Sequence, residues 1–538
     1  MRDVSSRQRQ KNEKESGEVA MLMQTREKTP QATEEKDIDS YDFPTDAKKS
    51  DANSIALLLF LYLLQGIPIG LSASVPMVLQ SRQVGYAKQA IFSMSSWPFS
   101  LKLLWAPIVD SCYSQKFGRR KSWLVPVQYL IGVFMLMLSC YSSRLLGDGD
   151  DTDVEPNVEL LTMIFFLLYF LTATQDIVVD GWALTMLSRR NIGHASTCNS
   201  VGQTAGFFLG YVVFLALESP EFCNNYLRWT PKSEGLVTLS DFMFFWGCVF
   251  LVTTTLVWWL KQEKVDTTLD GEEKIGIVAT YRLCYSVMSL PAVKLYCVIV
   301  LTARVGYAAV DALTGLKLIE AGVPKEELAF IGIPMVPLQI ILPLVIAKYM
   351  AGPRPLDILL KFVPFRLLIG VVIAIFVWWT QTNASEAGVF SYSYYGVAVV
   401  IYGLQQVAST AMFVAPIAFH AQISDPTIGG TYMTLINTIT NVGGTWPRTL
   451  ALALVDSITW RSCTTSEGHE IPGINCIGHH KIDECTSHGG MCHTQLDGYY
   501  IETLVCTILG FIWLYYCRRL LSDLQDRDES AWRISSRR

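Results

Sequence analysis

Long apolar segments constrain the fold of this chain more than any other feature of its sequence. A helix needs about 20 mostly apolar residues to cross the hydrocarbon core of a bilayer. Twelve segments of the 538 residues have this character: 54–79, 89–110, 122–143, 159–187, 197–217, 240–260, 291–319, 326–349, 366–381, 392–421, 430–455 and 498–517. Several contain Pro or Gly, which membrane helices tolerate when neighbouring helices satisfy the freed backbone groups. The sequence therefore predicts an all-α polytopic membrane protein with 12 transmembrane helices.

Charged residues are too few for a soluble chain, and they are unevenly distributed. They make up 17 % of the residues, against about a quarter in soluble proteins. Of the 91 charged residues, 22 lie in residues 1–52. This segment has no apolar stretch of the kind that a signal peptide requires, and its composition predicts a disordered tail. The composition excludes a soluble enzyme, and the net charge of -5 excludes a nucleic-acid-binding protein, which needs a basic surface.

The twelve predicted helices divide into two sets of six. The longest connection near the middle of the chain is 261–290, which separates 53–260 from 291–517 and leaves a C-terminal tail at 518–538. The two halves show weak internal sequence similarity, for example between Phe99–Leu104 and Pro337–Leu342. Two six-helix halves with a substrate site between them are typical of transporters of the major facilitator type, which work by alternating access.

Lysine and arginine near the predicted helix ends indicate the orientation in the membrane. Sixteen lie on one side and eight on the other, and the richer side is expected to be cytosolic. Both termini would then be cytosolic. Asn383, in the N-x-S sequence Asn383-Ala384-Ser385, falls on the opposite side as a candidate glycosylation site. The cysteine-rich segment 456–495 also falls on that side.

Charged residues inside the predicted helices need a physical reason, because each costs roughly 2.5–3.5 kcal/mol at membrane depth. Lys102 lies in the second helix, and Asp176 and Asp180 lie one helical turn apart in the fourth. We expect Lys102 to be electrostatically coupled to one of these aspartates. Three roles are open for this group: structural pairing between helices, a proton relay, or contact with the substrate. Asp311 in the seventh helix completes the predicted intramembrane charge network.

Arg304 is the strongest candidate for binding an anionic substrate. It lies in the middle of the seventh helix, and arginine does not shed its charge. The alternative is that Arg304 only pairs with Asp311. Lys317 and Arg448 lie closer to helix ends, so we expect them to extend toward the membrane surface. His420 is expected to be a structural histidine near a helix end.

The loop after the second helix contains Asp110 and then Gly118, Arg119 and Arg120. In major facilitator transporters a comparable turn holds neighbouring helix ends together on the cytosolic side, which makes these residues a candidate gate motif. They also serve as a positive anchor on that side, and both roles are compatible.

Four cysteines, Cys463, Cys476, Cys485 and Cys492, lie close together in the outward segment. Disulfides are the expected state in an oxidising compartment, and a zinc site is the weaker alternative because no C-x-x-C or H-x-x-x-H spacing is present. The chain also has no G-x-S-x-G, Walker A or H-E-x-x-H motif. We therefore expect neither an enzyme nor a bound metal or cofactor.

Four segments resemble the acetyl-coenzyme A transporters of the endoplasmic reticulum membrane, solute carrier family 33. They are Phe60–Pro68, Trp97–Pro107, Ala173–Ala183 and Ile428–Thr434. Two of them also carry Lys-Leu-Leu-Trp-Ala-Pro and Gln-Asp-Ile-x-x-Asp patterns that are similar to bacterial muropeptide permeases. The segments 199–206 and 311–318 resemble the narrower family. The resemblance runs from about residue 52 to about residue 530.

This resemblance implies import of acetyl-CoA from the cytosol into the lumen of the endoplasmic reticulum, where it feeds acetylation. The implied partners are acetyl-CoA and the lipid bilayer. Whether free CoA is a counter-substrate and whether the chain forms a homodimer are left open. Candidate binding groups are cations for the phosphates and aromatic or polar side chains for the adenine: Arg304, Lys102, Lys317, Arg448, Trp182, Tyr307, Trp446, Gln203 and Asn437.

Two other functions fit the sequence. One is proton-coupled transport of another anionic or peptide-like solute, which a pH-gradient dependence of uptake would favour. The other is a membrane-embedded acetyltransferase, for which His420 is the only candidate base within the predicted helices.

Overall fold

The structure is a computed structural model. It describes residues 46–114, 116–146, 156–187, 194–261, 263, 277–350, 354–383, 390–424, 429–465, 476 and 485–533. The chain divides into two compact units, Met1–Ser50 and Asp51–Arg538. The predicted disordered tail, residues 1–52, lies almost wholly outside the described residues. The fold below is that of the second unit.

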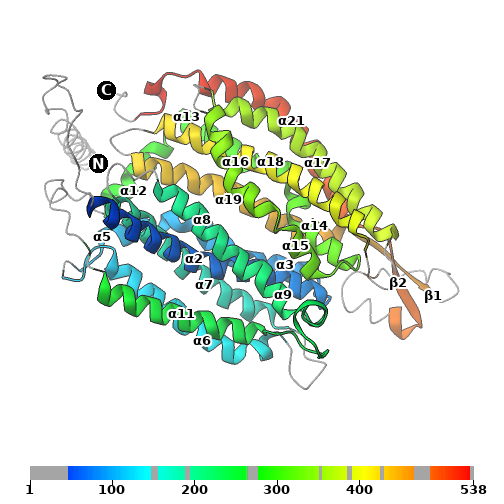
Figure 1. Cartoon of the computed structure of the whole chain (residues 1–538). Helices are drawn as coiled ribbons and strands as arrows, with labels where there is room; N and C mark the ends of the chain where they lie inside the picture. The colour runs from blue at the N-terminus through cyan, green and yellow to red at the C-terminus, as the bar shows by residue number, and fades with distance from the viewer. Residues whose placement is uncertain are drawn as a thin grey trace, which may run out of the picture. The chain divides into compact units, whose positions relative to one another are not determined.

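The N-terminal half contains the first six membrane-length elements, of which the second and fifth are made of several helical pieces (Figure 1). In chain order the elements are α2 (Asp46–Ser81), α3 (Tyr86–Ser93), η1 (Met94–Ser96), α4 (Trp97–Leu101), η2 (Lys102–Leu104), α5 (Ala106–Ser111), α6 (Lys121–Leu146), α7 (Val158–Met186), α8 (His194–Phe208), the π-helical η4 (Leu209–Val213), α9 (Phe214–Glu218), α10 (Pro220–Phe222), η5 (Cys223–Leu227) and α11 (Leu239–Leu260).

The rest of the chain comprises a short helix in the connection between the halves, α12, and the C-terminal half, which ends with a hairpin and a last long helix. Its elements are α12 (Ile277–Met288), α13 (Pro291–Thr302), η6 (Val305–Tyr307), α14 (Ala308–Glu320), α15 (Lys325–Ile331), α16 (Met335–Met350), α17 (Leu356–Asn383), α18 (Tyr392–Ile423), α19 (Gly429–Ile458), β1 (Trp460–Thr465), β2 (Gly490–Leu496), α21 (Gly498–Gln525) and η7 (Glu529–Ala531). The strands pair antiparallel, with Cys463 opposite Cys492.

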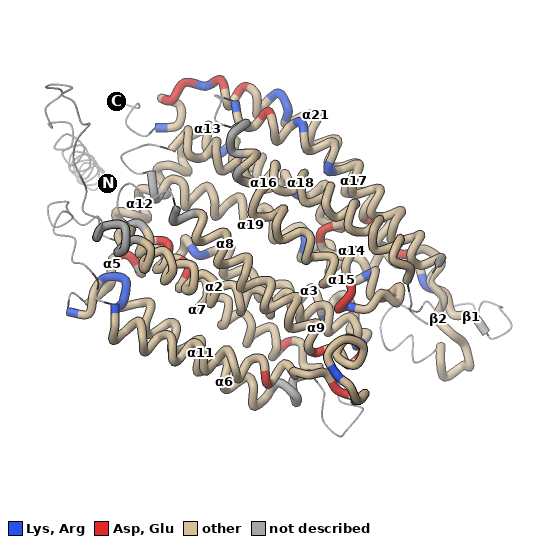
Figure 2. The backbone as a smooth tube through the Cα atoms, viewed as in Figure 1, with Lys and Arg blue, Asp and Glu red and all other residues tan. Residues whose placement is uncertain are grey.

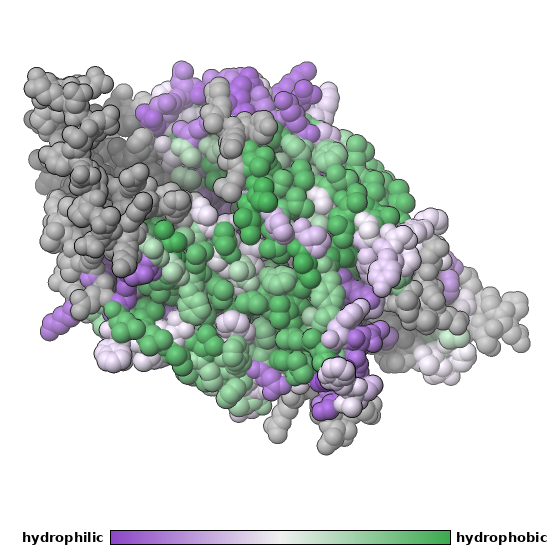
Figure 3. Space-filling view, viewed as in Figure 1, coloured by the Kyte–Doolittle hydropathy of each residue, from purple (hydrophilic) through white to green (hydrophobic). Residues whose placement is uncertain are grey.

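Ten helices in the described part of the chain are long and apolar enough to cross a membrane. Figure 3 shows the corresponding band of hydrophobic side chains across the helices, with hydrophilic residues gathered toward their ends. In Figure 2, Lys, Arg, Asp and Glu occupy few positions along the helices and gather near their ends. These observations confirm the predicted class, an all-α polytopic membrane protein.

The two remaining predicted spans, 89–110 and 430–455, correspond to the broken segment α3–α5 and to α19. They pack against each other across the two halves. Ser93 Oγ donates a hydrogen bond to Thr449 Oγ1 at 2.8 Å, and Ser100 and Thr445 share another at 2.8 Å. Both spans thus present Ser and Thr side chains to each other inside the bundle.

Helices α2 and α8 cross closely through glycines. A Cβ atom at Gly206 would lie 2.0 Å from the carbonyl oxygen of Leu63, and one at Gly66 would lie 2.3 Å from the carbonyl oxygen of Gln203. Small residues of this kind allow the backbones of membrane helices to approach one another. Gln203, a predicted binding residue, thus lies at this packed crossing.

The predicted span 366–381 and the predicted tail 518–538 both differ from the structure. Helix α17 begins at Leu356, so Arg366 lies inside the helix and is buried rather than flanking it. In the sequence the apolar segment begins only at Arg366, because the sequence shows the charge of this residue but not the partner that neutralises it. The last helix continues to Gln525, and Trp532 packs against Tyr296 and Phe419.

We name the two ends of the bundle by what they carry. The end at which α19 finishes, β1 and β2 lie and α21 begins is the hairpin side (Figure 1). The opposite end, at which α11 finishes and α12 lies, is the linker side.

Candidate functional site

Among the membrane-length segments that consist of several helical pieces, two carry a cation at an interruption. Lys102 follows α4 and opens η2. Arg304 lies between α13 and η6, where the seventh predicted span leaves the α-helical conformation. Interrupted helices near the middle of the membrane are where many transporters build their binding sites. The breaks therefore locate the candidate site.

Lys102 forms an ion pair with Asp176 of α7. The Asp176 side chain is only 3 % exposed, and it also accepts a hydrogen bond from Gln65 Nε2 of α2. Asp180, one turn away, accepts from Tyr62 Oη at 2.8 Å and from Asn199 Nδ2 at 3.0 Å. Of the two candidate aspartates, Asp176 is thus the one that the structure pairs with Lys102.

Asp311 belongs to a separate group in the C-terminal half, so the predicted single network is wrong at this position. It forms an ion pair with Arg366 of α17, whose side chain is 5 % exposed. Arg366 also donates to the carbonyl oxygen of Gln405 at 3.1 Å and lies 5.3 Å from the centre of the Tyr307 ring. The alternative role of Arg304, pairing with Asp311, is likewise not what the structure shows, because Arg366 is the partner.

Arg304 and Arg448 meet at Gly444 of α19. Arg448 Nε donates to the carbonyl oxygen of Gly444 at 2.9 Å, and a Cβ atom at Gly444 would lie 2.6 Å from Arg304 Nη1. Neither arginine has an ion-pair partner among the described residues. Arg448 is exposed and lies within electrostatic range of Asp311, Arg304 and Tyr169. Because these three residues come from three different elements, the exposed guanidinium of Arg448 faces into the bundle, not along a helix end as predicted.

Aromatic contacts around Lys102 lead to Tyr169, which is linked electrostatically to the other half. Lys102 Nζ lies 5.3 Å from the centre of the Phe99 ring, and Phe99 packs edge-on against Tyr169 of α7 at 6.3 Å. Tyr169 is in turn within electrostatic range of Arg448. We call Arg304, Arg448, Tyr169, Lys102 and Tyr307 the central cationic site.

Lys317 does not extend toward the membrane surface as predicted. It is 1 % exposed and bonds Asp497 at 2.6 Å and Glu320 at 2.9 Å. Tyr86 of α3 donates to Glu320 at 2.5 Å, and the ring of Tyr86 lies 4.7 Å from Lys317 Nζ. We call Tyr86, Lys317, Glu320 and Asp497 the hairpin-side latch, because Tyr86 comes from the N-terminal half and the other three come from the C-terminal half.

A second set of polar contacts also joins the halves on the hairpin side. Lys325 of α15 forms an ion pair with Glu218 of α9 at 2.6 Å, and Ser219 donates to Glu326 at 2.6 Å. On the linker side, Tyr281 of α12 donates to the carbonyl oxygen of Leu104. The described conformation is therefore closed on the hairpin side by two groups of inter-half contacts.

Three other predicted residues lie in packed surroundings. Trp182 is 2 % exposed within a core cluster that includes Tyr62 and Val178, so it offers no shelf for a ligand. His420 is fully buried, with Nε2 bonded to Tyr296 at 2.9 Å and Nδ1 bonded to Asn437 at 2.5 Å. His420 thus has the structural role expected for it. The Asn437 side chain, a predicted binding group, is engaged by His420.

Trp446 donates from Nε1 to the carbonyl oxygen of Leu301 at 2.9 Å, just before the break at Arg304. It remains partly exposed. Trp446 is therefore positioned beside the central cationic site, whereas Trp182 is not.

The candidate gate motif assembles on the linker side. Arg120 Nη1 lies 2.7 Å from Asp110 Oδ1, and Arg119 Nε donates to the Asp110 carbonyl oxygen at 3.2 Å. Glu263 accepts from the backbone N–H of Arg120 at 2.9 Å. Gly118 adopts a φ of +99°, which favours glycine, and it lies against the Glu263 side chain. These contacts tie α5, the start of α6 and residue 263 together.

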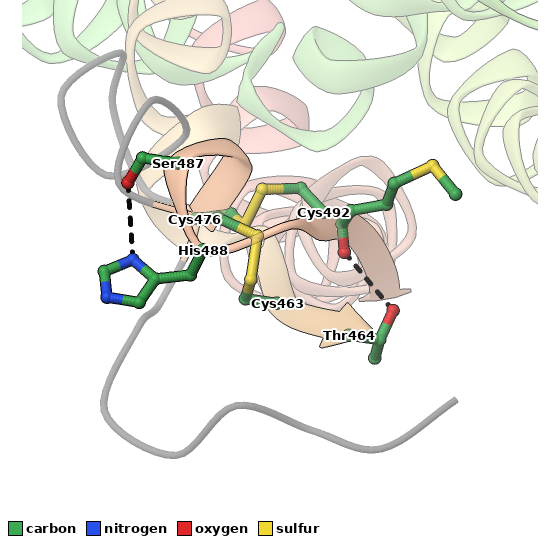
Figure 4. Close-up of a disulfide and its surroundings, with 8 residues drawn as sticks. Cys463, Thr464, Cys476, Ser487, His488 and Cys492 are labelled. Atoms are coloured by element: carbon green, nitrogen blue, oxygen red, sulfur yellow. Dashed lines mark hydrogen bonds between the residues drawn. A yellow bond between two sulfur atoms is a disulfide. The ribbon is translucent and has the colours of Figure 1, made fainter. Parts of the chain in front are cut away.

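The four cysteines of segment 456–495 form two disulfides, Cys463–Cys485 and Cys476–Cys492. Figure 4 shows their surroundings, with Cys463, Cys476 and Cys492 labelled. Cys463, Cys476 and Cys485 bring their sulfur atoms within 4.8 Å of one another because the two disulfides pack together. Sulfur atoms in disulfides are not the thiolates that bind zinc. Asn383 is the last residue of α17, and glycosylation at this position remains a prediction.

Comparisons with known proteins show the family of this chain. The family model described as acetyl-coenzyme A transporter 1 matches residues 54–275, 265–380 and 364–534. An uncharacterized membrane protein of Saccharomyces cerevisiae is 32% identical over 90% of this chain and 98% of its own. An uncharacterized protein of Schizosaccharomyces pombe is 34% identical over 92% and 91%. The anhydromuropeptide permease of Escherichia coli K12 is 26% identical over 30% of this chain and 31% of its own.

Solved structures show the fold. A bacterial homolog of the human lysosomal transporter Spinster, inward-facing and unoccupied, has a TM-score of 0.51 at 11% identity and covers 89% of this chain and 98% of its own. The D-xylose-proton symporter has a TM-score of 0.51 at 12% identity and covers 86% and 97%. These similarities confirm the predicted major facilitator architecture. The chain is a multi-pass membrane transporter and belongs to the acetyl-coenzyme A transporter 1 family.

Proposed function

We propose that this transporter carries acetyl-CoA from the cytosol into the lumen of the endoplasmic reticulum by alternating access, where it supplies acetylation. The observation that carries the proposal is the meeting of Arg304 and Arg448 at Gly444, without a carboxylate partner among the described residues. Two like charges at this depth repel each other and are costly to bury unless an anion joins them. Acetyl-CoA supplies such an anion in its diphosphate.

The charges around the site leave these two arginines available. Lys102 is neutralised by Asp176, and Arg366 is neutralised by Asp311. A guanidinium can hold phosphate oxygens with two parallel hydrogen bonds, which a lysine cannot do. We assign the diphosphate to Arg304 and Arg448 and give Lys102 and Arg366 a structural role. Lys317 leaves the set of binding candidates because the latch occupies it.

Aromatic side chains next to the arginines suit the adenine ring. Trp446 lies on α19 two residues before Arg448, and Tyr169 faces Arg448 from the other half. Tyr307 is less suitable because it is buried beneath Arg366.

The two sides of the membrane follow from the disulfides and the basic residues. Disulfides persist in oxidising compartments, so we assign the hairpin side to the lumen. The linker side, which carries the excess of Lys and Arg, is then cytosolic, and both termini lie there. Moving Arg366 out of the flanking residues changes the predicted bias to fifteen against eight and leaves its direction unchanged. Closure on the hairpin side then separates the central cationic site from the lumen.

Equilibrium binding to the purified full-length protein in lipid nanodiscs tests the assignment. Arg304→Ala and Arg448→Ala should each weaken acetyl-CoA binding roughly ten- to a hundred-fold, because each removes a charge-assisted hydrogen bond worth about 1.5–3 kcal/mol. Arg304→Lys should fall between Arg304→Ala and the unmodified protein. Arg518→Ala removes an exposed arginine of α21 and is the matched control, with unchanged affinity. Unchanged affinity in Arg304→Ala and Arg448→Ala, with both proteins folded, would contradict the proposal.

A second candidate substrate is a peptide-like solute, and the partial similarity to the anhydromuropeptide permease favours it. Competition separates the two. Free CoA should displace bound acetyl-CoA, whereas an anhydromuropeptide should not. The reverse order of competition would favour the second candidate.

A further inference from the structure

One buried carboxyl group beside the hairpin-side latch takes no part in it. Glu502 lies near the start of α21 and is 6 % exposed. Neither of its carboxyl oxygens has a hydrogen-bond partner among the described residues. The charged groups within electrostatic range of it are Asp497 and Lys317. Glu502 is therefore a buried acid next to a lysine that could neutralise it only if that lysine were free.

Lys317 is already committed to other partners. Its ammonium group bonds Asp497 and Glu320, and it faces the ring of Tyr86. An ammonium group has three N–H donors, and these contacts account for them. Three carboxyl groups, those of Glu320, Asp497 and Glu502, thus lie around one lysine, and Glu502 is the one without a hydrogen bond.

We propose that Glu502 is a proton-binding site and that its carboxyl group carries a proton in the conformation closed on the hairpin side. A carboxylate anion that is removed from water and has neither a hydrogen-bond donor nor a cation of its own is strongly disfavoured relative to the neutral acid. A proton is the ligand that fits a single carboxyl group, because metal cations require several oxygen ligands.

The latch couples this proton to closure. Tyr86 is the contribution of the N-terminal half, so opening on the hairpin side removes its hydroxyl from Glu320 and its ring from Lys317. Water then reaches the surroundings of Glu502, and the ionised form no longer carries the cost of burial. The proton consequently binds the closed conformation more tightly than the open one. By linkage, acid on the hairpin side favours closure and a higher pH favours opening.

Other titratable groups near the latch set the background for a pH measurement. They come from the elements packed around it: Tyr86 of α3, Lys317 and Glu320 of α14, Tyr402 of α18, Asp456 of α19, and Asp497, Tyr499, Tyr500 and Cys506 at or after the start of α21. For this reason each experiment compares the unmodified protein with a variant in which these other groups are unchanged.

Infrared difference spectroscopy of the purified full-length protein in nanodiscs tests the proton directly. The protein should show the C=O stretch of a protonated carboxylic acid, and Glu502→Gln should remove that band. Glu159→Gln, which changes an exposed carboxylate at the start of α7, should leave the band in place. A spectrum of Glu502→Gln identical to that of the unmodified protein would overturn the proposal. No acetyl-CoA is used, so the outcome is independent of the proposed substrate.

Spin-label distances between the two halves on the hairpin side test the coupling. For the unmodified protein, the ratio of closed to open molecules should fall by up to about tenfold per pH unit through the titration of Glu502, because one proton is linked to the change. Glu502→Gln should flatten this dependence and remain closed. Glu502→Met, an apolar side chain of similar length, should do the same and serves if the amide is poorly tolerated. An unchanged pH dependence in a folded variant would refute the coupling.

Discussion

Removing the cation of the Lys102–Asp176 pair is the sharpest stability test of the site. Asp176 is 3 % exposed and would retain only Gln65 as a donor in a Lys102→Met variant. Methionine replaces the stem of the lysine without its charge, so the loss is mainly electrostatic. Breaking a buried ion pair from one side costs about 3–5 kcal/mol, because the remaining charge is left without compensation.

A second substitution identifies the partner. Asp176→Asn in the Lys102→Met background removes the uncompensated charge and keeps an acceptor for Gln65, so most of the lost stability should return. Asp180→Asn in the same background should restore little, since Asp180 is held by Tyr62 and Asn199. A coupling of about 0.5–3 kcal/mol between Lys102 and Asp176 is the expected range for residues in contact.

Thermal unfolding of the purified variants in one detergent, followed by intrinsic fluorescence, measures these differences. The expected order of midpoints is the unmodified protein, then Lys102→Met with Asp176→Asn, and last Lys102→Met alone. A stable Lys102→Met variant, or rescue by Asp180→Asn and not by Asp176→Asn, would refute the assigned pairing.

Three further predictions concern other parts of the fold. Gly206→Val should destabilise the protein by about 1–3 kcal/mol or more through overpacking against Leu63. Gly396→Ala should be tolerated, because its added Cβ atom meets no neighbouring atom. The thermal unfolding midpoints of the two variants, measured against that of the unmodified protein, test this difference. Cys463→Ser with Cys485→Ser should lower the stability of the hairpin by about 3 kcal/mol, measured as faster proteolysis near β1 and β2; equal proteolysis would contradict a stabilising disulfide. Lys317→Met should favour opening on the hairpin side, because Asp497 and Glu320 lose the cation that they share. A thiol reagent should then label a cysteine introduced at Gly315 faster than in the protein with Lys317. An unchanged labelling rate would argue against the latch.

Some of the site could be predicted from single residues and the cost of burying charge. Lys102 and Asp176 lie in apolar segments where each needs an opposite charge, so their coupling follows from the sequence. Arg304 was recognisable for the same reason. The sequence does not predict the break at Arg304, because Gly306 of η6 is one of several glycines in the apolar segments and membrane helices tolerate glycine without breaking.

Other parts depend on contacts between distant residues. Lys317 looked close enough to a helix end to extend outward, but Asp497, 180 residues later, binds it inside the protein. Arg366 looked like a flanking charge until its partner Asp311 placed it within α17. Nothing in the sequence distinguishes Glu502 from other acids near helix starts, and only its burial and its lack of hydrogen-bond donors single it out.

Uptake of labelled acetyl-CoA into liposomes containing the purified full-length protein tests the central claim most directly. We predict saturable uptake that is inhibited by free CoA outside the liposomes. If the carrier exchanges the two molecules, CoA loaded inside the liposomes should accelerate uptake. Arg304→Ala and Arg448→Ala should strongly reduce uptake, whereas Arg518→Ala should not. Uptake no greater than in protein-free liposomes, from protein shown to be folded, would contradict acetyl-CoA as the substrate. Uptake that Arg304→Ala with Arg448→Ala leaves unchanged would contradict the central cationic site as its path.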